Sequence, residues 1–250
     1  MKALIDLDIL CYELGGAFEN TDGVTVDDPD HPLVMQRVHG KIESIVHKVG
    51  ADSWEGFLTD SPSNFRLKVA TILPYKGHRK SEKPIFHWHI REALNKMPNV
   101  HMSEGQEADD DLGIYQYAAW ASDDRDETIV CSRDKDLRMI PGYHYGWKMG
   151  NQKEFPVTYI SLVDGYKNFY QQMLTGDTSD NIPGLYGVGP KSSLVKKVRD
   201  CDQPEDMEKI VLKAYEDRFG FYAGLFYNEN WNLLWILREP LHLDTLEKTL

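Results

Sequence analysis

Short apolar runs alternate with amphipathic stretches through about the first 160 residues of the chain. Residues 2–6, 54–60 and 128–131 are apolar runs with the length of buried strands. Residues 33–49 place their aliphatic side chains near one face of a helix. Because strands and helices alternate, we expect an α/β fold in which a central, mostly parallel sheet is flanked by helices.

Weaker signals extend this pattern. Further strands are predicted at 99–102, 143–149 and 155–160, and further helices at 64–71, 84–97 and 107–122, with a helical turn over 135–140. After about residue 161 the pattern is mostly helical. We therefore predict an α/β core over residues 1–160 and a C-terminal helical lobe over 161–250.

Composition limits the class of protein. A chain of 250 residues with 41% hydrophobic content can bury one large core with a small helical lobe. It has no apolar run of 18 residues and no basic-then-apolar start, so we expect no membrane association and no export. Cys11, Cys131 and Cys201 lack the spacing of a disulfide framework or a zinc site, which fits a cytoplasmic location.

Acidic residues stand at the ends of predicted strands and the starts of predicted helices. Asp6, Asp60 and Asp134 each follow an apolar strand, so they should converge on one edge of a parallel sheet. The full set of candidate metal ligands is Asp6, Asp60, Glu107, Asp109, Asp110, Asp134, Asp136, Asp177 and Asp180. Helix capping is the alternative role for several of them. So many carboxylates at one place would repel one another unless Mg²⁺ or Mn²⁺, which prefer oxygen ligands, compensated them.

A glycine-rich segment at residues 176–191 joins the last two of these acids to a helix start. The spacing of Asp177 and Asp180 would place both carboxylates on one side of a helical turn. Glycines at 184, 187 and 189 allow backbone N–H groups to approach a phosphate, and Lys191 adds a cation. By itself the segment would fit a purely structural corner between helices better, but the acidic residues upstream favour the functional interpretation.

The net charge of −12 argues against a nucleic-acid partner until the position of the acids is considered. Nine of the acids form the proposed cluster, which leaves a net charge of −3 on the rest of the chain. Basic residues gather within 76–96 and again within 191–199. Each of these segments could follow a phosphate backbone, although charged helix faces are often only solvated.

The order of these motifs resembles the 5′-nuclease family of phages and bacteria, which comprises flap endonucleases, 5′→3′ exonucleases and the nuclease domain of DNA polymerase I. The motifs that carry the resemblance lie at 4–6, 59–60, 75–79, 107–110, 134–136 and 176–184. The chain looks most like the free-standing phage enzymes, whose location would be the host cytoplasm.

The resemblance implies hydrolysis of DNA to 5′-phosphate and 3′-hydroxyl products with two bound Mg²⁺ or Mn²⁺ ions. Asp6, Asp60, Glu107, Asp109 and Asp110 would organise one ion, with the four later aspartates around the second. Lys76 and Arg79 match the family's catalytic basic pair. Tyr75 matches a position where a ring can stack on a base, although packing beside Pro74 is an equal alternative.

The resemblance also implies a helix-turn-helix-type grip on duplex DNA at about 177–199, with K⁺ or Na⁺ held by turn carbonyls. The DNA-binding residues expected there are Gly184, Gly187, Gly189, Lys191, Ser192 and Lys196. An arch-like segment would lie at about 73–105, but only 27 residues separate Arg79 from Glu107, so the arch should be short or open. The expected substrate is DNA with a duplex region and a 5′ end or flap, or an RNA–DNA hybrid, bound by a monomer.

Two other functions remain open at this point. A PIN-like RNA endonuclease would share the sheet and the acidic pocket without needing the glycine-rich grip. A catalytically silent protein that binds DNA structures would keep the grip without needing every acidic residue. The presence of all the acidic residues favours catalysis.

Overall fold

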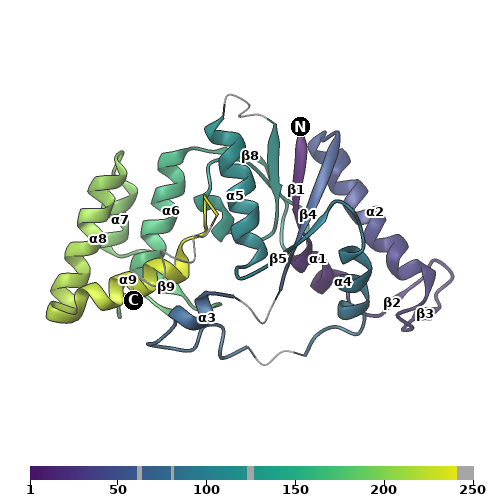
Figure 1. Cartoon of the computed structure of the whole chain (residues 1–250), viewed down its shortest axis with the longest axis horizontal. Helices are drawn as coiled ribbons and strands as arrows, with labels where there is room; N and C mark the ends of the chain where they lie inside the picture. Colours follow the sequence, from purple (N-terminus) through teal and green to yellow (C-terminus); the bar gives the residue numbers. More distant parts are fainter. Residues whose placement is uncertain (61–63, 80–81, 123–126, 241–250) are drawn as a thin grey trace.

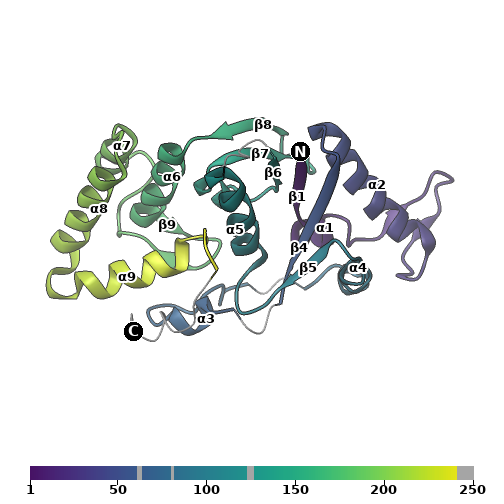
Figure 2. The ribbon, with the colours of Figure 1, turned by 45° about the horizontal axis from the view of Figure 1, so that its top comes forward.

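The computed structural model describes residues 1–60, 64–79, 82–122 and 127–240. Its centre is a six-stranded sheet in the order β5-β4-β1-β6-β7-β8 (Figures 1 and 2). The strands are β1 (Lys2–Asp6), β4 (Ser53–Thr59), β5 (Val100–Ser103), β6 (Thr128–Cys131), β7 (Gly142–Gly146) and β8 (Phe155–Ile160). All neighbours pair in parallel except β7 and β8. The predicted α/β fold class is confirmed.

Alternation along the central strands divides the interior into two cores. Ala3 and Ile5 of β1 face a core that includes Ile42 of α2 (Pro32–Val49) and Ile90 of α4 (His87–Asn95). Leu4 faces the other core, which includes Leu112 of α5 (Ala108–Ala121). Because both faces are covered, a ligand can approach these strands only at their carboxyl ends.

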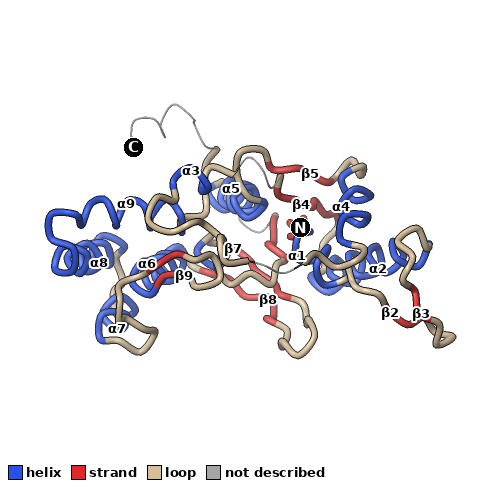
Figure 3. Tube along the Cα trace, turned by 90° about the horizontal axis from the view of Figure 1, so that it is seen from below, coloured by secondary structure: helices blue, strands red, loops and turns tan. Residues whose placement is uncertain are grey.

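Helices dominate the chain after β8 (Figure 3). They are α6 (Leu162–Thr175), α7 (Ser193–Arg199), α8 (Pro204–Phe219) and α9 (Ala223–Leu234), with the 3₁₀ turn η3 (Gly220–Tyr222). Their apolar side chains join the same core as α5, with Phe169 and Val211 fully buried. The division of the chain near residue 160 therefore stays a prediction, because one continuous core crosses it.

Three short elements were not expected. Helix α1 (Leu7–Glu13) begins directly after β1, and its seven residues are too few to give a clear periodic signal. The small hairpin of β2 (Phe18–Glu19) and β3 (Thr25–Val26) follows it. A second hairpin, β9 (Gly176–Asp177) with β10 (Ile182–Pro183), replaces the helical turn predicted for the two late aspartates.

The second hairpin is enforced by close backbone packing. Gly176 has φ +71°, and a Cβ there would lie 2.3 Å from the Gly184 backbone nitrogen. Asn181 also has a left-handed backbone, with φ 63°. Neither conformation belongs to a right-handed helix, so the spacing of Asp177 and Asp180 reflects a turn.

The predicted arch is shorter than residues 73–105. Its second half belongs to the body of the protein, because Phe86, Ile90 and Leu94 are fully buried and β5 pairs with β4. Residues 80–81 lie outside the described part.

The remaining helices are α3 (Arg66–Val69) and the 3₁₀ turn η2 (Asp136–Met139). No helix in the described ranges has the length and apolar content needed to cross a bilayer.

Candidate active site

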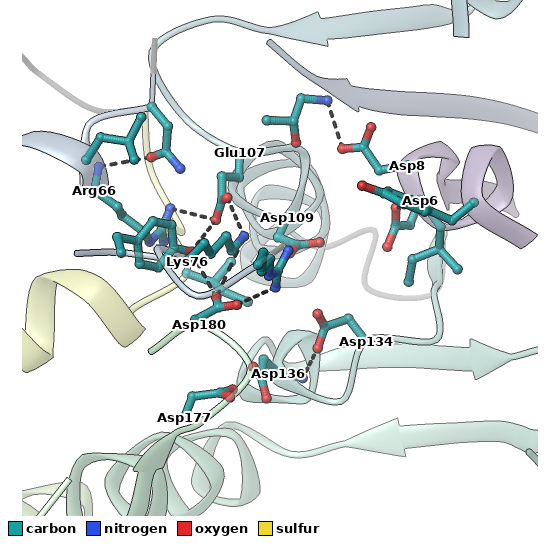
Figure 4. A pocket seen from close by; sticks show the side chains of 18 of the residues that line it. Asp6, Asp8, Arg66, Lys76, Glu107, Asp109, Asp134, Asp136, Asp177 and Asp180 are labelled. Atoms are coloured by element: carbon teal, nitrogen blue, oxygen red, sulfur yellow. Dashed lines mark hydrogen bonds and ion pairs between the residues drawn. The ribbon is translucent and has the colours of Figure 1, made fainter. Parts of the chain in front are cut away.

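A cavity of about 460 Å³ opens at the carboxyl ends of β1 and β6. Seven of the nine predicted metal ligands line it: Asp6, Glu107, Asp109, Asp134, Asp136, Asp177 and Asp180. They come from four places in the sequence, and Figure 4 shows their side chains around one space. The structure thus brings together residues separated by as many as 174 positions.

The sheet supplies the first group. Asp6 ends β1 and caps α1, accepting a hydrogen bond from the Ile9 backbone N–H at 3.2 Å. Ser132, just after β6, donates its hydroxyl to Asp6 Oδ2 at 2.7 Å. The same hydroxyl accepts from the Asp134 backbone N–H at 2.9 Å, so one serine fixes the relative position of the two acids.

Helix α5 supplies the second group, and its successive acids have different surroundings. Glu107 precedes the helix, and its carboxylate accepts from Lys76 Nζ at 2.5 Å. Asp109 lines the cavity without an ion pair among the described residues. Asp110 points into the protein, where Arg66 contacts both its oxygens at 2.5 and 2.8 Å.

Asp110, predicted as a metal ligand, therefore lies away from the cavity that holds most of the other predicted ligands. Its side chain is fully buried and also accepts from the Leu237 backbone N–H at 3.0 Å. Adjacent positions on a helix point about 100° apart, so Asp109 and Asp110 could not both face the cavity. Asp60 is also absent from the cavity lining, and its backbone N–H bonds to Ser103 at the end of the neighbouring strand.

The β9–β10 hairpin supplies the third group. Asp177 Oδ1 accepts from both the backbone N–H and the hydroxyl of Ser179, at 2.7 and 2.6 Å. Asp177 Oδ2 is buried without a partner among the described residues. Asp180 instead lies against the basic pair, with Arg79 Nη2 at 2.6 Å and Lys76 Nζ at 3.7 Å.

Lys76 and Arg79 both line the cavity, as expected for the basic pair. Burial alone would lower the pKa of Lys76, but Glu107 and Asp180 outweigh it and raise the pKa, so the ammonium stays charged. The pKa of Glu107 shifts in the complementary direction. Burial alone would raise it, but the charges of Lys76 and Arg66 lower it below the ordinary value. Lys76 also has φ 53°, an uncommon backbone for a residue with a side chain.

Five acids at the cavity lack a close ion pair, and we call them the unpaired carboxylates: Asp6, Asp109, Asp134, Asp136 and Asp177. Burial and the charge of Asp8 raise the pKa of Asp6 to about 7. Burial and Asp134 raise that of Asp136 to about 8. Burial, followed by the charges of Asp134 and Asp6, raises the pKa of Asp109 well above its usual value. Positive charge from Lys76 and Lys135 offsets only part of the shifts of Asp109 and Asp136.

The donor set fits hard divalent cations. It consists of carboxylate oxygens, one of which, Asp177 Oδ2, is buried without a partner. Within the described residues, no three acidic, histidine or cysteine side chains are yet gathered at the spacing of a single ion. Asp6, Asp136 and Asp177 instead accept hydrogen bonds from hydroxyl or amide groups, which reduces the cost of their mutual repulsion.

Tyr75 takes the packing role. Its ring is only 5% exposed and belongs to the main core, so it cannot stack on a base as the structure stands. Its hydroxyl donates to Glu107 Oε2 at 2.7 Å and lies 2.9 Å from Asp180 Oδ2. Tyr75 thus ties together two of the cavity acids.

The residues expected to grip duplex DNA divide into structural and open positions. Gly184 packs against the backbone of Thr175 and Gly176, which leaves no room for a phosphate, and Ser192 caps α7 through the Val195 N–H. Gly187, with φ +81°, has open space around it.

Gly189 is equally open, and Lys191 and Lys196 are exposed. No helix directly precedes this turn, because the β9–β10 hairpin lies there. The segment therefore differs from a simple helix-turn-helix.

Several residues of the cavity were not identified from the sequence. Arg66 has no local motif, and its role follows only from its contact with Asp110. Asp8, which was not among the predicted ligands, also lines the cavity and is paired with Arg91. Tyr12 of α1 and Trp88 of α4 also line the cavity while remaining 42% and 59% exposed. A tyrosine one helical turn beyond Asp8 is the signal that could have indicated Tyr12.

The fold and the cavity define the class of the protein as an α/β protein with the architecture of 5′-nucleases. Two solved structures share it. The T5 protein co-crystallised with metal ions has a TM-score of 0.56 at 15% identity, covering 94% of this chain and 98% of that one. The bacteriophage T5 flap endonuclease in a complex with DNA and metal ions has a TM-score of 0.55 at 14% identity, covering 94% and 99%. At these identities the likeness establishes the fold.

Sequence relatives confirm the resemblance carried by the motifs. DNA polymerase I of Rhizobium leguminosarum is 34% identical over 124 residues, which are 45% of this chain and 12% of that protein. A 5′-3′ exonuclease of Halalkalibacterium halodurans is 30% identical over 97 residues, 35% of this chain and 31% of that protein. The chain thus matches less than a third of either relative's length. No protein-family model matches it.

Proposed function

We propose that this protein is a divalent-metal-dependent 5′-nuclease that hydrolyses phosphodiesters of DNA to 5′-phosphate and 3′-hydroxyl products. Its substrates would be DNA with a duplex region and a 5′ end or flap, and RNA–DNA hybrids of the same shape. It would act as a monomer in the cytoplasm, where its three free cysteines stay reduced.

The observation that carries this proposal is the set of unpaired carboxylates facing the basic pair across one cavity. Asp6, Asp109 and Asp134 would hold one Mg²⁺ or Mn²⁺ ion, and Asp134, Asp136 and Asp177 a second. When bound, the two ions supply a strong nucleophile from water and neutralise charge on the leaving oxygen. A protein that only binds DNA would gain nothing from five acids held in this unfavourable arrangement.

The basic pair would stabilise the reacting phosphate. Lys76 and Arg79 are positioned at the cavity by Glu107 and Asp180, with which they form ion pairs of 2.5 and 2.6 Å. Cations aimed at a phosphate stabilise the charge that develops in its transition state. Alanine at either position should lower the single-turnover rate by roughly ten- to a thousandfold, the scale of one lost electrostatic contact.

The open turn at Gly187, Gly189 and Lys191 would bind the backbone of the duplex part, with K⁺ or Na⁺ at its carbonyls. It lies in the helical half, across the molecule from α1 and α4 (Figure 1). An unpaired end that passes the carboxylates would then meet the exposed rings of Tyr12 and Trp88, which could stack on its bases.

Cleavage of end-labelled 5′-flap, nicked, blunt and single-stranded substrates tests the proposal, with matched RNA–DNA hybrids. We expect 5′-phosphate products in Mg²⁺ or Mn²⁺ and none in EDTA. Metal-dependent cutting of single-stranded RNA alone would favour a PIN-like RNA endonuclease. Tight binding of flaps without cutting in either metal would favour a silent DNA-structure-binding protein.

A further inference from the structure

Two neighbouring side chains of α9 hold two loops that meet at the cavity. Glu229 contacts the segment before the basic pair, and Asn230 contacts the hairpin that carries Asp177 and Asp180. Helix α9 packs against both α3 and β10. Helix α9 therefore contacts both of the loops that place Lys76 and Arg79 beside the acids of the cavity.

Glu229 binds its loop through the backbone. Its Oε1 accepts from the backbone N–H groups of Thr71 and Ile72 at 3.0 and 2.8 Å, and its Oε2 accepts from the Thr71 hydroxyl. The glutamate is 6% exposed and forms no ion pair with any described residue. A buried carboxylate with only neutral donors is costly, so hydrophobic packing would suit stability better.

Asn230 binds the other loop. Its Nδ2 donates to the Pro183 carbonyl at 2.6 Å and to the Tyr215 hydroxyl at 2.7 Å. Tyr215 is fully buried and donates to the Met173 carbonyl at 2.6 Å, which anchors Asn230 to α6. Pro183 lies three residues after Asp180, so this contact fixes the end of the hairpin.

The two loops also contact each other. The Lys76 backbone N–H donates to the Asp180 carbonyl at 2.8 Å, and Asn181 Nδ2 donates to the Pro74 carbonyl at 2.9 Å. Lys76 and Asn181 both have left-handed backbones. Such conformations persist when the surrounding contacts hold them in place. The two loops hold each other through these bonds, and α9 anchors each loop a few residues away, at Thr71 and Ile72 and at Pro183.

We propose that Glu229, with Asn230 beside it, is a positioning residue that sets Lys76 and Arg79 for the reaction. Glu229 touches no substrate and acts through the loop at 71–79. This inference rests on the proposed nuclease function. It predicts that loss of Glu229 lowers the chemical step through the basic pair, while binding of duplex substrate changes little.

Variants of Glu229 separate position from charge. Glu229→Ala removes all three contacts and should lower the single-turnover rate about ten- to a hundredfold, with the substrate Kd within about threefold, since small misplacements cost up to about 10²-fold. Glu229→Gln keeps Oε1 for both backbone amides, and its amide group can donate to the Thr71 hydroxyl. It should therefore retain the rate within about threefold. An equal loss in both variants would overturn the positioning role.

A double-mutant cycle is the decisive test. If Glu229 acts only through the basic pair, Glu229→Ala should cost less than about twofold in a Lys76→Ala, Arg79→Ala background. An undiminished loss in that background would overturn the inference. Val211→Ala is the matched control. Val211 is fully buried in the helical half, so its replacement should lower stability without lowering the rate.

Two further measurements test the role of Glu229 without a folded Glu229→Ala variant or without an activity assay. If Glu229→Ala does not fold, Thr71→Val can replace it, because this change removes one of the three contacts. It should lower the rate about two- to fivefold in the wild type and have almost no effect in the Lys76→Ala, Arg79→Ala background. Hydrogen exchange needs no activity: amides within 71–79 should exchange faster in Glu229→Ala than in Val211→Ala. If the wild type cuts no substrate the proposed function fails, whereas unchanged exchange at 71–79 removes this inference alone.

Discussion

Acids in and around the cavity differ in how the fold treats them. Asp8, Glu107, Asp110 and Asp180 each form an ion pair with a basic side chain, and the Asp110–Arg66 pair is almost completely buried. The unpaired carboxylates have hydroxyl and amide donors or each other, and the closest cation is the exposed Lys135 at 3.9 Å from Asp136. The paired acids are compensated by basic side chains of the protein itself, whereas compensation of the unpaired carboxylates requires bound cations.

This difference gives opposite expectations for substitution. Removal of a paired acid leaves a cation without that partner and should destabilise the fold, most strongly where the cation is buried. Removal of an unpaired acid whose pKa is raised, which holds for Asp6, Asp109, Asp134 and Asp136, relieves repulsion and the burial of charge, so it should stabilise the metal-free protein. Stability without metal therefore distinguishes a structural acid from a ligand, independently of any activity assay.

The largest effect should follow from Asp134→Asn. We expect at least about a thousandfold slower cleavage, because a ligand at the reacting centre is lost, with little loss of DNA binding. In EDTA the same variant should melt a few degrees higher than the wild type. Asp202→Asn, an exposed acid far along the chain, serves as the control for both measurements. Near-normal turnover at saturating Mg²⁺ would remove Asp134 from the site.

Asp110→Asn should behave in the opposite way. Asp110 is fully excluded from solvent and Arg66 is 3% exposed, so the variant would leave a buried guanidinium whose remaining acidic partner is Glu107 at 3.7 Å. The free energy of unfolding should fall by about 3–5 kcal/mol. Urea denaturation in EDTA measures this, and any residual folded protein should still bind Mg²⁺. A variant as stable as the wild type would contradict the structural role of Asp110.

The pH dependence of stability in EDTA should reveal the unpaired carboxylates. The pKa values of Asp6 and Asp136 rise from 3.8 to about 7 and about 8 in the folded state. Between these values the folded protein binds more protons than the unfolded one, so its stability falls as pH rises from about 4 to about 8. Thermal melting across this range should show a decline of several degrees, smaller in Asp136→Asn. A rise in melting temperature that this variant leaves unchanged would contradict the assignment.

The smallest effect should come from the open turn. Lys191→Ala should weaken duplex binding a few fold and reduce the slope of log K against log salt by about 0.9, since one counterion fewer is released. Gly189→Val should weaken the same substrates through steric bulk near the backbone. Short single strands should be cut at nearly unchanged rates by both variants. Equal losses on both substrate types would mean that the turn supports the active-site fold.

The sequence was sufficient to predict the features of the fold and the site that depend on local hydrophobic pattern. Asp6 and Asp134 could be placed together because each ends an apolar run and parallel strands share an edge. The directions of Asp109 and Asp110 depended instead on helix phase and on Arg66, which is 44 residues away. The burial of Tyr75 and the β9–β10 hairpin arose from contacts between distant segments and from left-handed backbones that periodicity does not encode.

Calorimetric titration of Mn²⁺ or Mg²⁺ into metal-free protein tests the central claim most directly, namely that the unpaired carboxylates hold divalent cations. We predict saturable binding by the wild type, much weaker binding by Asp134→Asn, and unchanged binding by Asp202→Asn. Equal binding by all three proteins, or no binding by the wild type, would contradict the claim.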